Sequence, residues 1–247
     1  MRRPVVAGNW KMHGSRAWLE AWLRDWRAHL RARAELIVLP PAPYLAIVRD
    51  AIDDRRIRVG AQNVHAQASG AFTGEIAAEM VKDLGADCTL VGHSERRQGC
   101  GETDEVVAAK FVAARRAGLT PILCVGEHLE ERRRGVATEV VLAQLDAVIA
   151  HAGIAAFEDA LVAYEPVWAI GSGSVATPQD AEQMQAAIRA RLAEHARDVA
   201  EALPILYGGS IKAGNAASLF AEPDVDGGLV GGASLDAGEF ALICNAA

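Results

Sequence analysis

The stretch TLVGHSERRQGCGETDEVVAAKFVAARRAGLTPILCV, residues 89–125, decides the fold. It opens with the short apolar run Thr89–Val91, passes through a segment of helical periodicity at Val106–Ala117, and ends in a second apolar run at Pro121–Val125. Two short apolar runs joined by a helix are typical of a βαβ unit, in which the two strands are parallel. This stretch therefore predicts a parallel sheet with helices packed against it.

The same alternation of apolar runs and helical segments extends in both directions along the 247 residues. The other helical segments that we expect are Trp18–Leu30, Val140–Ala150 and Pro178–Ala200. Eight βα units in about 250 residues fit a closed (β/α)8 barrel better than an open sheet, so we predict an α/β protein with one barrel domain over residues 1–247. The eight predicted strands are Val5–Gly8, Leu36–Leu39, Ile57–Ala61, Thr89–Val91, Pro121–Val125, Leu161–Tyr164, Ile205–Tyr207 and Leu229–Val230.

Composition narrows the class of protein. The net charge of −7 argues against nucleic acid and anionic membranes as partners. The apolar stretch within Met1–Met12 is too short for a signal peptide, and no run is long enough to cross a bilayer, so we expect a cytoplasmic protein. Four scattered cysteines without a C-x-x-C pair predict neither a metal site nor a disulfide framework: Cys88, Cys100, Cys124 and Cys244.

Polar and glycine-rich residues follow the predicted strands at their carboxyl ends. In a parallel barrel these ends share one face, which is where active sites form. We therefore expect residues far apart in the sequence to converge there. They are Asn9 and Lys11 after the first strand, His93, Ser94 and Glu95 after the fourth, Glu165 after the sixth, Gly208-Gly209-Ser210 after the seventh and Gly231-Gly232 after the eighth.

Each of these residues also has a purely structural interpretation. A glutamate after a strand is often a solvated loop charge, and a lone His93 could be a hydrogen-bonded structural histidine. Pro166 restrains the backbone of Glu165 to extended conformations, which favours a positioned carboxylate. The glycine pairs after the last two strands could be simple turns, but together they also suit backbone N–H groups that close on a phosphate.

The segment Gly171–Ala176 (GSGSVA) matches the G-x-G-x-x-A fingerprint of dinucleotide-binding proteins. That motif works only where its first glycine turns directly from a strand into a helix. Here Pro166–Ile170 intervenes, and the next helix begins only near Pro178, after the capping residue Thr177. We therefore expect no dinucleotide cofactor.

Seven motifs resemble those of one enzyme family, triosephosphate isomerase, in the family's order and over nearly the whole chain. The segments around Glu165 and His93 are the most specific of them. The motifs are NWKM (9–12), GAQN (60–63), GHSERR (92–97), CVGE (124–127), YEPVWAIG (164–171), YGGS (207–210) and LVGGASL (229–235).

The resemblance implies a TIM barrel with its active site at the C-terminal ends of the strands and with no cofactor or metal. It also implies the interconversion of dihydroxyacetone phosphate and D-glyceraldehyde 3-phosphate through an enediolate, in glycolysis and gluconeogenesis. Glu165 would be the base and His93 the electrophile, while Asn9 and Lys11 would contact the substrate and Glu95 would hold Lys11. The phosphate would be bound by backbone N–H groups of Gly171, Ser210 and Gly232, with Gly231 alongside.

The resemblance further implies a homodimer. The unusually long connection Gln62–Glu75 is typical of a functional or interface loop, and its residues Thr73 and Glu75 would contact the neighbouring subunit. Gly99-Cys100 departs from the family pattern beside this contact. The segment Pro166–Ala176 resembles the family's mobile lid, where Ser172 and Ser174 depart from the common hinge residues.

The residues after His93 bear on its charge. Ser94 and Glu95 are typical of the start of a short helix. A helix N-terminus beside an imidazole disfavours its cationic form, so we expect a neutral His93 that donates a hydrogen bond.

Two other functions are compatible with a phosphate-binding barrel. A Schiff-base aldolase would need a desolvated lysine deep in the barrel, whereas Lys11 lies beyond the first strand. A non-catalytic phosphosugar-binding scaffold would not need Glu165 and His93 together with Asn9 and Lys11.

Overall fold

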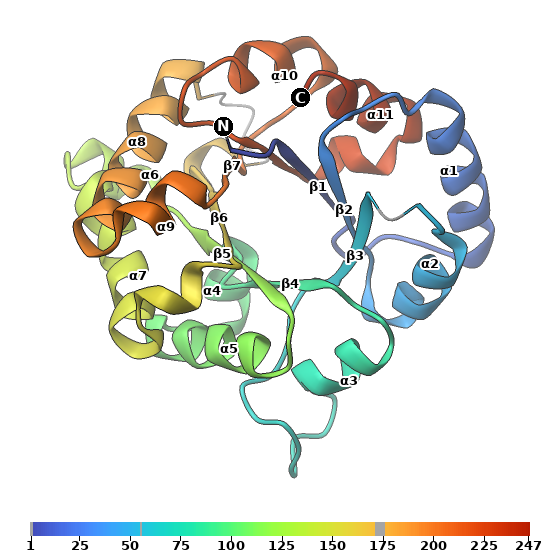
Figure 1. Ribbon diagram of the computed structural model, residues 1–247, viewed down its shortest axis with the longest axis horizontal. Helices are drawn as coiled ribbons and strands as arrows, with labels where there is room; N and C mark the ends of the chain where they lie inside the picture. Colours follow the sequence, from blue (N-terminus) through green and yellow to red (C-terminus); the bar gives the residue numbers. More distant parts are fainter. Residues whose placement is uncertain (1, 55, 171–175) are drawn as a thin grey trace.

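Eight parallel strands close into a barrel in which neighbours in the sequence are neighbours in space, and β1 pairs with β8 (Figure 1). The computed structural model describes residues 2–54, 56–170 and 176–247. The predicted (β/α)8 barrel is confirmed. The strands are β1 (Val5–Asn9), β2 (Glu35–Leu39), β3 (Ile57–Ala61), β4 (Cys88–Val91), β5 (Thr120–Val125), β6 (Leu161–Tyr164), β7 (Ile205–Tyr207) and β8 (Gly227–Val230).

Helices surround the barrel on its outside (Figure 1). Helices α1 to α10 lie between consecutive strands, so they cover the sheet while the chain returns to begin the next parallel strand, and α11 follows β8. The helices are α1 (Arg16–His29), α2 (Leu45–Ala51), α3 (Ala78–Asp83), α4 (Ser94–Cys100), α5 (Asp104–Arg116), α6 (Leu129–Arg133), α7 (Ala137–Ala152), α8 (Pro178–His195), α9 (Arg197–Ala202), α10 (Ala213–Phe220) and α11 (Ala237–Asn245), with short 3-10 helices at Ala42–Tyr44, Ile154–Phe157, Val167–Ala169 and Gly232–Leu235.

The hydrophobic core has two layers, because alternate residues of each strand point to opposite faces. Val5 and Ala7 of β1 belong to the cluster inside the barrel. Val6 belongs to the layer between strands and helices, where it joins Trp22 and Trp26 of α1. Both layers are closed to solvent, so the barrel is a packed support for the residues at its ends.

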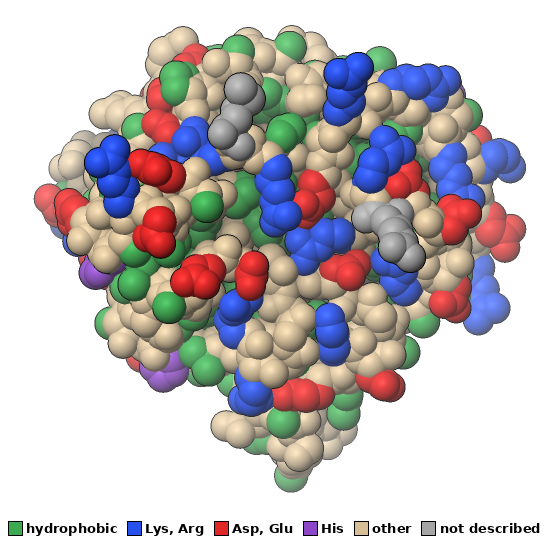
Figure 2. Space-filling view, viewed as in Figure 1, with side chains coloured by type: hydrophobic (Ala, Val, Ile, Leu, Met, Phe, Trp, Pro, Cys, Tyr) green, Lys and Arg blue, Asp and Glu red, His purple; other side chains and the backbone are tan. Residues whose placement is uncertain are grey.

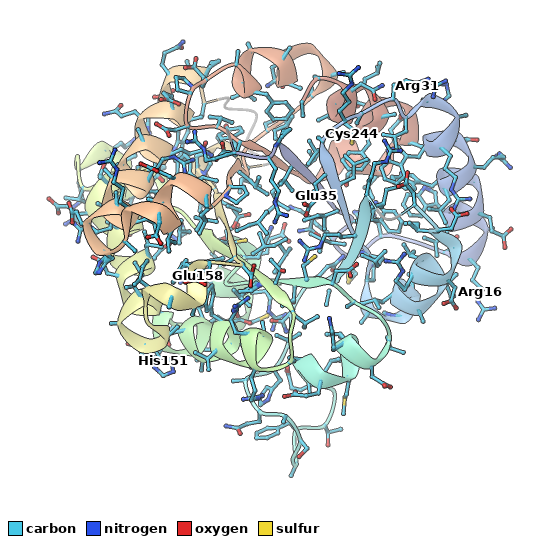
Figure 3. All side chains as sticks on the ribbon, viewed as in Figure 1. Arg16, Arg31, Glu35, His151, Glu158 and Cys244 are labelled. Carbon is cyan, nitrogen blue, oxygen red and sulfur yellow. The ribbon has the colours of Figure 1, made fainter. Side chains whose placement is uncertain are left out.

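Charged side chains gather on the barrel face that carries the N-terminus, which Figure 2 shows. Glu35, labelled in Figure 3 near the centre of the ring of strands, forms ion pairs with Arg3 (2.9 Å) and Arg58 (3.0 Å). Arg189 pairs with both Asp224 (2.5 Å) and Asp226 (2.6 Å). Opposite charges therefore balance across the end of the barrel remote from the predicted site.

The predicted helix Pro178–Ala200 is wrong in one respect, because it is interrupted at Ala196, where φ is −157° and ψ is 111°. The helix is interrupted because of contacts between residues that belong to different helical segments. Arg189 donates to the carbonyl oxygens of Ala200 (2.7 Å) and Leu203 (3.0 Å), which holds α9 back against α8. Such contacts override a helical pattern read from local sequence.

The last strand is longer than the predicted run Leu229–Val230 and begins at Gly227. A Cβ atom on Gly227 would lie 1.9 Å from the carbonyl oxygen of Val5, and the φ of Gly227 is +134°. Only glycine fits this approach of β8 to β1.

Among the described ranges, no helix has the length and hydropathy needed to span a membrane.

Candidate active site

Glu165 follows β6 directly, and its side chain is buried, with 2% of the residue exposed. One carboxylate oxygen, Oε2, accepts the backbone N–H of Ser94 (2.9 Å), and the other, Oε1, lies 3.0 Å from Nε2 of His93. Burial alone would raise the pKa of Glu165, but the imidazole of His93 and the Ser94 N–H hold that pKa below its ordinary value. The structure thus joins the ends of β4 and β6 through a charged carboxylate.

His93 caps the N-terminus of α4, as the sequence predicted for a short helix at this place. Its Nδ1 atom accepts the backbone N–H of Glu95 (3.2 Å), so a neutral imidazole carries its proton on Nε2 and donates it to Glu165. Burial lowers the pKa of His93, but the Glu165 carboxylate outweighs burial and raises it above the ordinary value. The neutral form of His93 stays a prediction, because the helix terminus and Glu165 act in opposite directions.

Lys11 is held in an unusual backbone conformation after β1. Among the residues that the structure describes, it is the one non-glycine residue with a positive φ, at 49°. The Asn9 side chain accepts the N–H of Lys11 (3.0 Å), while Gln62 donates to its carbonyl oxygen (2.9 Å). The Lys11 ammonium pairs with Glu95 at 2.5 Å. Strained backbone that is fixed by several partners is typical of a functional site.

These residues border a cavity of about 500 Å³ at the carboxyl ends of the strands. Gly208 is shaped by the site, because a Cβ atom there would lie 2.9 Å from Cγ of Glu165. The lining of the cavity unites nearly all the residues predicted for catalysis and phosphate binding, together with Glu95, which was predicted to hold Lys11: Asn9, Lys11, His93, Glu95, Glu165, Ser210, Gly231 and Gly232.

Several sequence predictions fall on 171–175, which lies outside the described residues. They include the phosphate contact of Gly171, the hinge positions Ser172 and Ser174, and most of the dinucleotide-like segment. On the far side of this gap the predicted cap is confirmed: Thr177 accepts the N–H of Asp180 (3.1 Å), and Asp180 accepts the N–H of Thr177 (2.9 Å).

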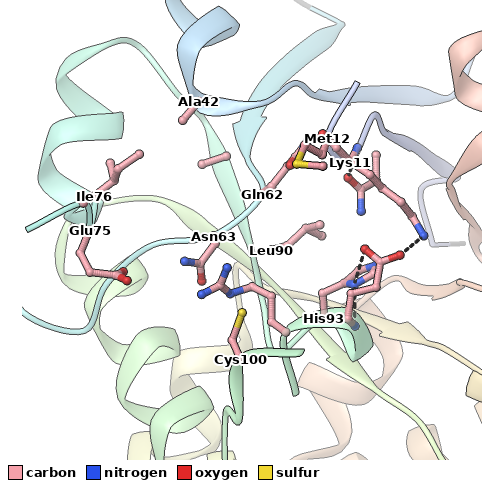
Figure 4. Close-up of a pocket in the computed structure, with 15 residues that line it drawn as sticks. Lys11, Met12, Ala42, Gln62, Asn63, Glu75, Ile76, Leu90, His93 and Cys100 are labelled. Carbon is pink, nitrogen blue, oxygen red and sulfur yellow. Dashed lines mark hydrogen bonds and ion pairs between the residues drawn. The ribbon is translucent and has the colours of Figure 1, made fainter. Parts of the chain in front are cut away.

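A second cavity of about 430 Å³ adjoins the first (Figure 4). Figure 4 shows Lys11 and His93 on one side of it and Glu75 and Ile76, from the end of the long connection after β3, on the other. Thr73 and Glu75 are both exposed. The structure therefore places the predicted dimer loop beside the site without bringing Thr73 into either cavity lining.

One buried carboxylate with a role near the site was not assigned from the sequence. Glu127 is fully buried, and its Oε1 accepts from Trp168 Nε1 (2.7 Å) and from the Tyr164 hydroxyl (3.1 Å). Burial raises its pKa despite these donors. The guanidinium of Arg132 lies 4.4 Å from the Trp168 ring centre and pairs with Asp180 at 2.5 Å. The motif CVGE was the one available signal.

The fold and the site define a class. A closed (β/α)8 barrel that gathers a buried carboxylate, an imidazole and a lysine around a cavity at its carboxyl ends is a TIM-barrel enzyme equipped for acid–base chemistry. Among the described residues, no three His, Cys, Asp or Glu side chains are grouped as metal ligands.

Comparison with known proteins gives the family. The family model described as triosephosphate isomerase matches residues 4–247. Proteins named triosephosphate isomerase from Thiobacillus denitrificans, Pseudomonas putida and Xanthomonas axonopodis pv. citri are 56%, 53% and 51% identical, over 100% of this chain and 99% of each relative. The chain belongs to the triosephosphate isomerase family.

Proposed function

We propose that the chain interconverts dihydroxyacetone phosphate and D-glyceraldehyde 3-phosphate, with Glu165 moving one proton between adjacent carbons. Membership of the family supports the reaction. The observation that carries the assignment of residues is the 3.0 Å contact between the buried carboxylate of Glu165 and Nε2 of His93, at the wall of the larger cavity.

Glu165 has the properties of a carbon base. Its pKa is held low, so the carboxylate is ionised at neutral pH and free to take a proton. It removes the proton from the carbon next to the carbonyl, the electron pair of that C–H bond forms the enediolate double bond, and the carbonyl π pair moves onto oxygen. Glu165 then returns the same proton to the former carbonyl carbon. The hydroxyl proton passes from the oxygen that becomes the new carbonyl to the oxygen that was the carbonyl, which balances the reaction. In the substrate complex the carboxylate gives up its contacts with Ser94 and His93 to reach that proton.

His93 and Lys11 stabilise the charge that develops on oxygen. The Nε2–H of His93 is directed into the site, and its Nδ1 is fixed by the backbone of α4. A donor that is oriented before the reaction stabilises an oxyanion without the cost of reorganising solvent. Lys11 adds a positive charge, and its pairing with Glu95 fixes the direction of the ammonium.

The phosphate occupies the end of the cavity lined by Ser210, Gly231 and Gly232, where backbone N–H groups supply donors. A Cβ atom on Gly231 would lie 3.3 Å from Cε of Lys11, so the glycine admits the lysine close to this end of the cavity. Gly171 completes the set as an expected contact.

A coupled assay of triose phosphate interconversion tests the proposal and separates it from the alternatives. A scaffold would bind triose phosphates without turnover. An aldolase would be trapped by borohydride on a lysine, but Lys11 is paired with a carboxylate and 27% of its side chain is exposed, so it lacks the desolvation that activates an amine. We expect isomerisation and no trapped adduct.

Lys11→Met should lower kcat/KM roughly ten- to hundredfold, because a hydrogen bond to a charged partner contributes about 1.5–3 kcal/mol. The remaining activity should depend less on salt, since Lys11 attracts a dianion to a chain with a net charge of −7. Steady-state kinetics at several ionic strengths measure both effects. Lys82→Met on α3 is the matched control, and unchanged kinetics for Lys11→Met would remove Lys11 from the site.

We also propose that the protein is a homodimer that works in the cytoplasm. The connection between β3 and α3 projects from the barrel in Figure 1, and Phe72 on it contacts His65 in a tilted arrangement with 4.3 Å between ring centres. Phe72 is 45% exposed on this connection, Met80 (54%) lies on α3 just after it, and Met12 (95%) lines the smaller cavity together with Glu75. Exposed apolar side chains that cluster in this way mark an interface, and the smaller cavity can receive the loop of a second copy.

The cytoplasmic location is supported by the state of the cysteines. All four are free thiols, which suits a reducing compartment.

Thr73→Arg should shift the protein from dimer to monomer, because a charged side chain at this exposed loop position would be buried in the interface without a partner. Sedimentation velocity should give twice the chain mass of 26.2 kDa for the wild type and a smaller particle for the variant. Ala150→Arg, at an exposed position on α7, should remain dimeric. A monomeric wild type, or a variant as dimeric as the control, would contradict the proposed interface.

A further inference from the structure

The backbone of Glu165 lies directly against the residues that follow β5. The N–H of Glu165 donates to the carbonyl oxygen of Val125 (2.8 Å), and the N–H of Val167 donates to that of Glu127 (3.1 Å). Gly126 stands between these two acceptors. A Cβ atom on Gly126 would lie 1.8 Å from the carbonyl oxygen of Glu165, so the backbone segments of these two residues are in contact at this point. The position of Glu165 therefore depends on that of the Gly126 backbone.

Gln144 holds Gly126 in place from the outer layer. It lies in α7, and its side-chain amide makes two hydrogen bonds with one residue. Oε1 accepts the N–H of Gly126 (2.8 Å), and Nε2 donates to the carbonyl oxygen of Gly126 (2.9 Å). The side chain thus supplies the paired bonds that a neighbouring strand would give, beyond the point where the β5 ladder ends at Val125.

The same side chain reaches the space behind the proposed base. Gln144, Ser94 and Glu165 line a cavity of about 30 Å³. Such a volume holds only a water molecule or two. Gly126 is bonded to the Gln144 amide on one side and lies against the carbonyl oxygen of Glu165 on the other, so a displacement of Gly126 is passed directly to Glu165.

We propose that Gln144 is a positioning residue for catalysis, which fixes the Gly126 backbone and through it the carboxylate of Glu165. The proposal rests on the proposed role of Glu165 as the base. Without the Gln144 amide, the N–H and C=O of Gly126 lose both partners, and the segment 125–127 shifts to find others. A displacement of about 1 Å at a reacting group can lower a rate on the order of 100-fold.

Gln144→Met keeps the length of the side chain and removes both hydrogen bonds. We expect kcat to fall about ten- to hundredfold with KM within about threefold of wild type, since the phosphate contacts lie on other strands. A purely structural role would lower the melting temperature and leave kcat of the folded enzyme unchanged. Gln183→Met, at an exposed position on α8, is the matched control and should keep wild-type kinetics.

Gln144→Glu is the second variant. It keeps the acceptor for the Gly126 N–H but loses the donor to the Gly126 carbonyl, so its kcat should lie between those of wild type and Gln144→Met. If Gln144→Met does not fold, a loss of about fivefold or more in Gln144→Glu supports the proposal, and a smaller loss overturns it.

The double variant Gln144→Met/Glu165→Asp distinguishes the two proposals. If Gln144 acts through the base, its removal should matter much less once the carboxylate is already displaced, so the two effects should not multiply. Full multiplication of the effects, or kcat of Gln144→Met within threefold of wild type, would overturn the positioning role alone. An active Glu165→Gln enzyme would instead overturn the proposed base.

Discussion

Glu165→Gln should lower kcat roughly 100- to 10,000-fold, because the amide cannot take a proton from carbon, and positioned proton transfer contributes a factor of this size. The amide is nearly the same shape as the carboxylate, and its oxygen can still accept the Ser94 N–H that now binds Oε2. The fold and the cavity should therefore be kept, and KM should change little. Steady-state kinetics in both directions measure the loss.

Glu165→Asp tests position instead of chemistry. The aspartate retracts the carboxylate by about one methylene, and a shift of ~1 Å can lower a rate on the order of 100-fold. Gly208 packs against Cγ of Glu165, so the shortened side chain leaves a gap there. Glu139→Gln, at an exposed position on α7, is the control. A kcat within threefold of wild type for either Glu165 variant would show that another group is the base.

Much of the barrel was predictable from the sequence, because each buried strand is a short apolar run that stands apart from its helical neighbours. The runs Ile57–Ala61, Leu161–Tyr164 and Ile205–Tyr207 coincide with β3, β6 and β7. The break at Ala196 was not predictable, since it depends on Arg189 reaching the carbonyl groups of a helix that follows. Local periodicity carries no signal for such a contact.

The residues of the site also fall into those that the sequence predicted and those that it did not. Residues that follow strands, such as Lys11, His93 and Glu165, were predicted to converge because one rule places all strand ends on one face, and they line one cavity. Glu127 and Gln144 were not assigned. Their importance comes from contacts between separate elements, with Trp168 and with Gly126, and a buried glutamate or a helical glutamine has no distinguishing pattern in the sequence.

His93→Asn should lower kcat roughly 100- to 1,000-fold, which is the usual loss when one oriented oxyanion donor is removed. Asparagine is a good N-cap, so it can still accept the Glu95 N–H at the start of α4. Its amide is too short to take the place of Nε2. The loss should therefore appear in kcat without unfolding of α4, and kinetics with circular dichroism measure the two separately.

The α4 N-terminus lowers the pKa of His93 and the Glu165 carboxylate raises it, so the charge of His93 should depend on whether Glu165 is ionised and close to it. In the free enzyme the carboxylate raises the pKa of His93, so the folded protein binds this proton more tightly than the unfolded chain. The resulting stabilisation is fully present below the unfolded pKa of about 6.5 and is lost as the pH rises through the folded pKa. Glu165→Gln should reverse the sign of this pH dependence.

With Glu165 neutralised, burial, the α4 terminus and the charge of Lys11 oppose only the remaining carboxylate of Glu95, and the pKa of His93 should fall below its ordinary value. In the mechanism that we propose, the same change occurs during the reaction, because the carboxylate leaves His93 when it turns to the substrate and the imidazole then donates as a neutral group. Nitrogen NMR of His93 across the pH range, in wild type and in Glu165→Gln, measures the shift. Equal pKa values in the two proteins, or an imidazolium signal at neutral pH in Glu165→Gln, would contradict a neutral donor.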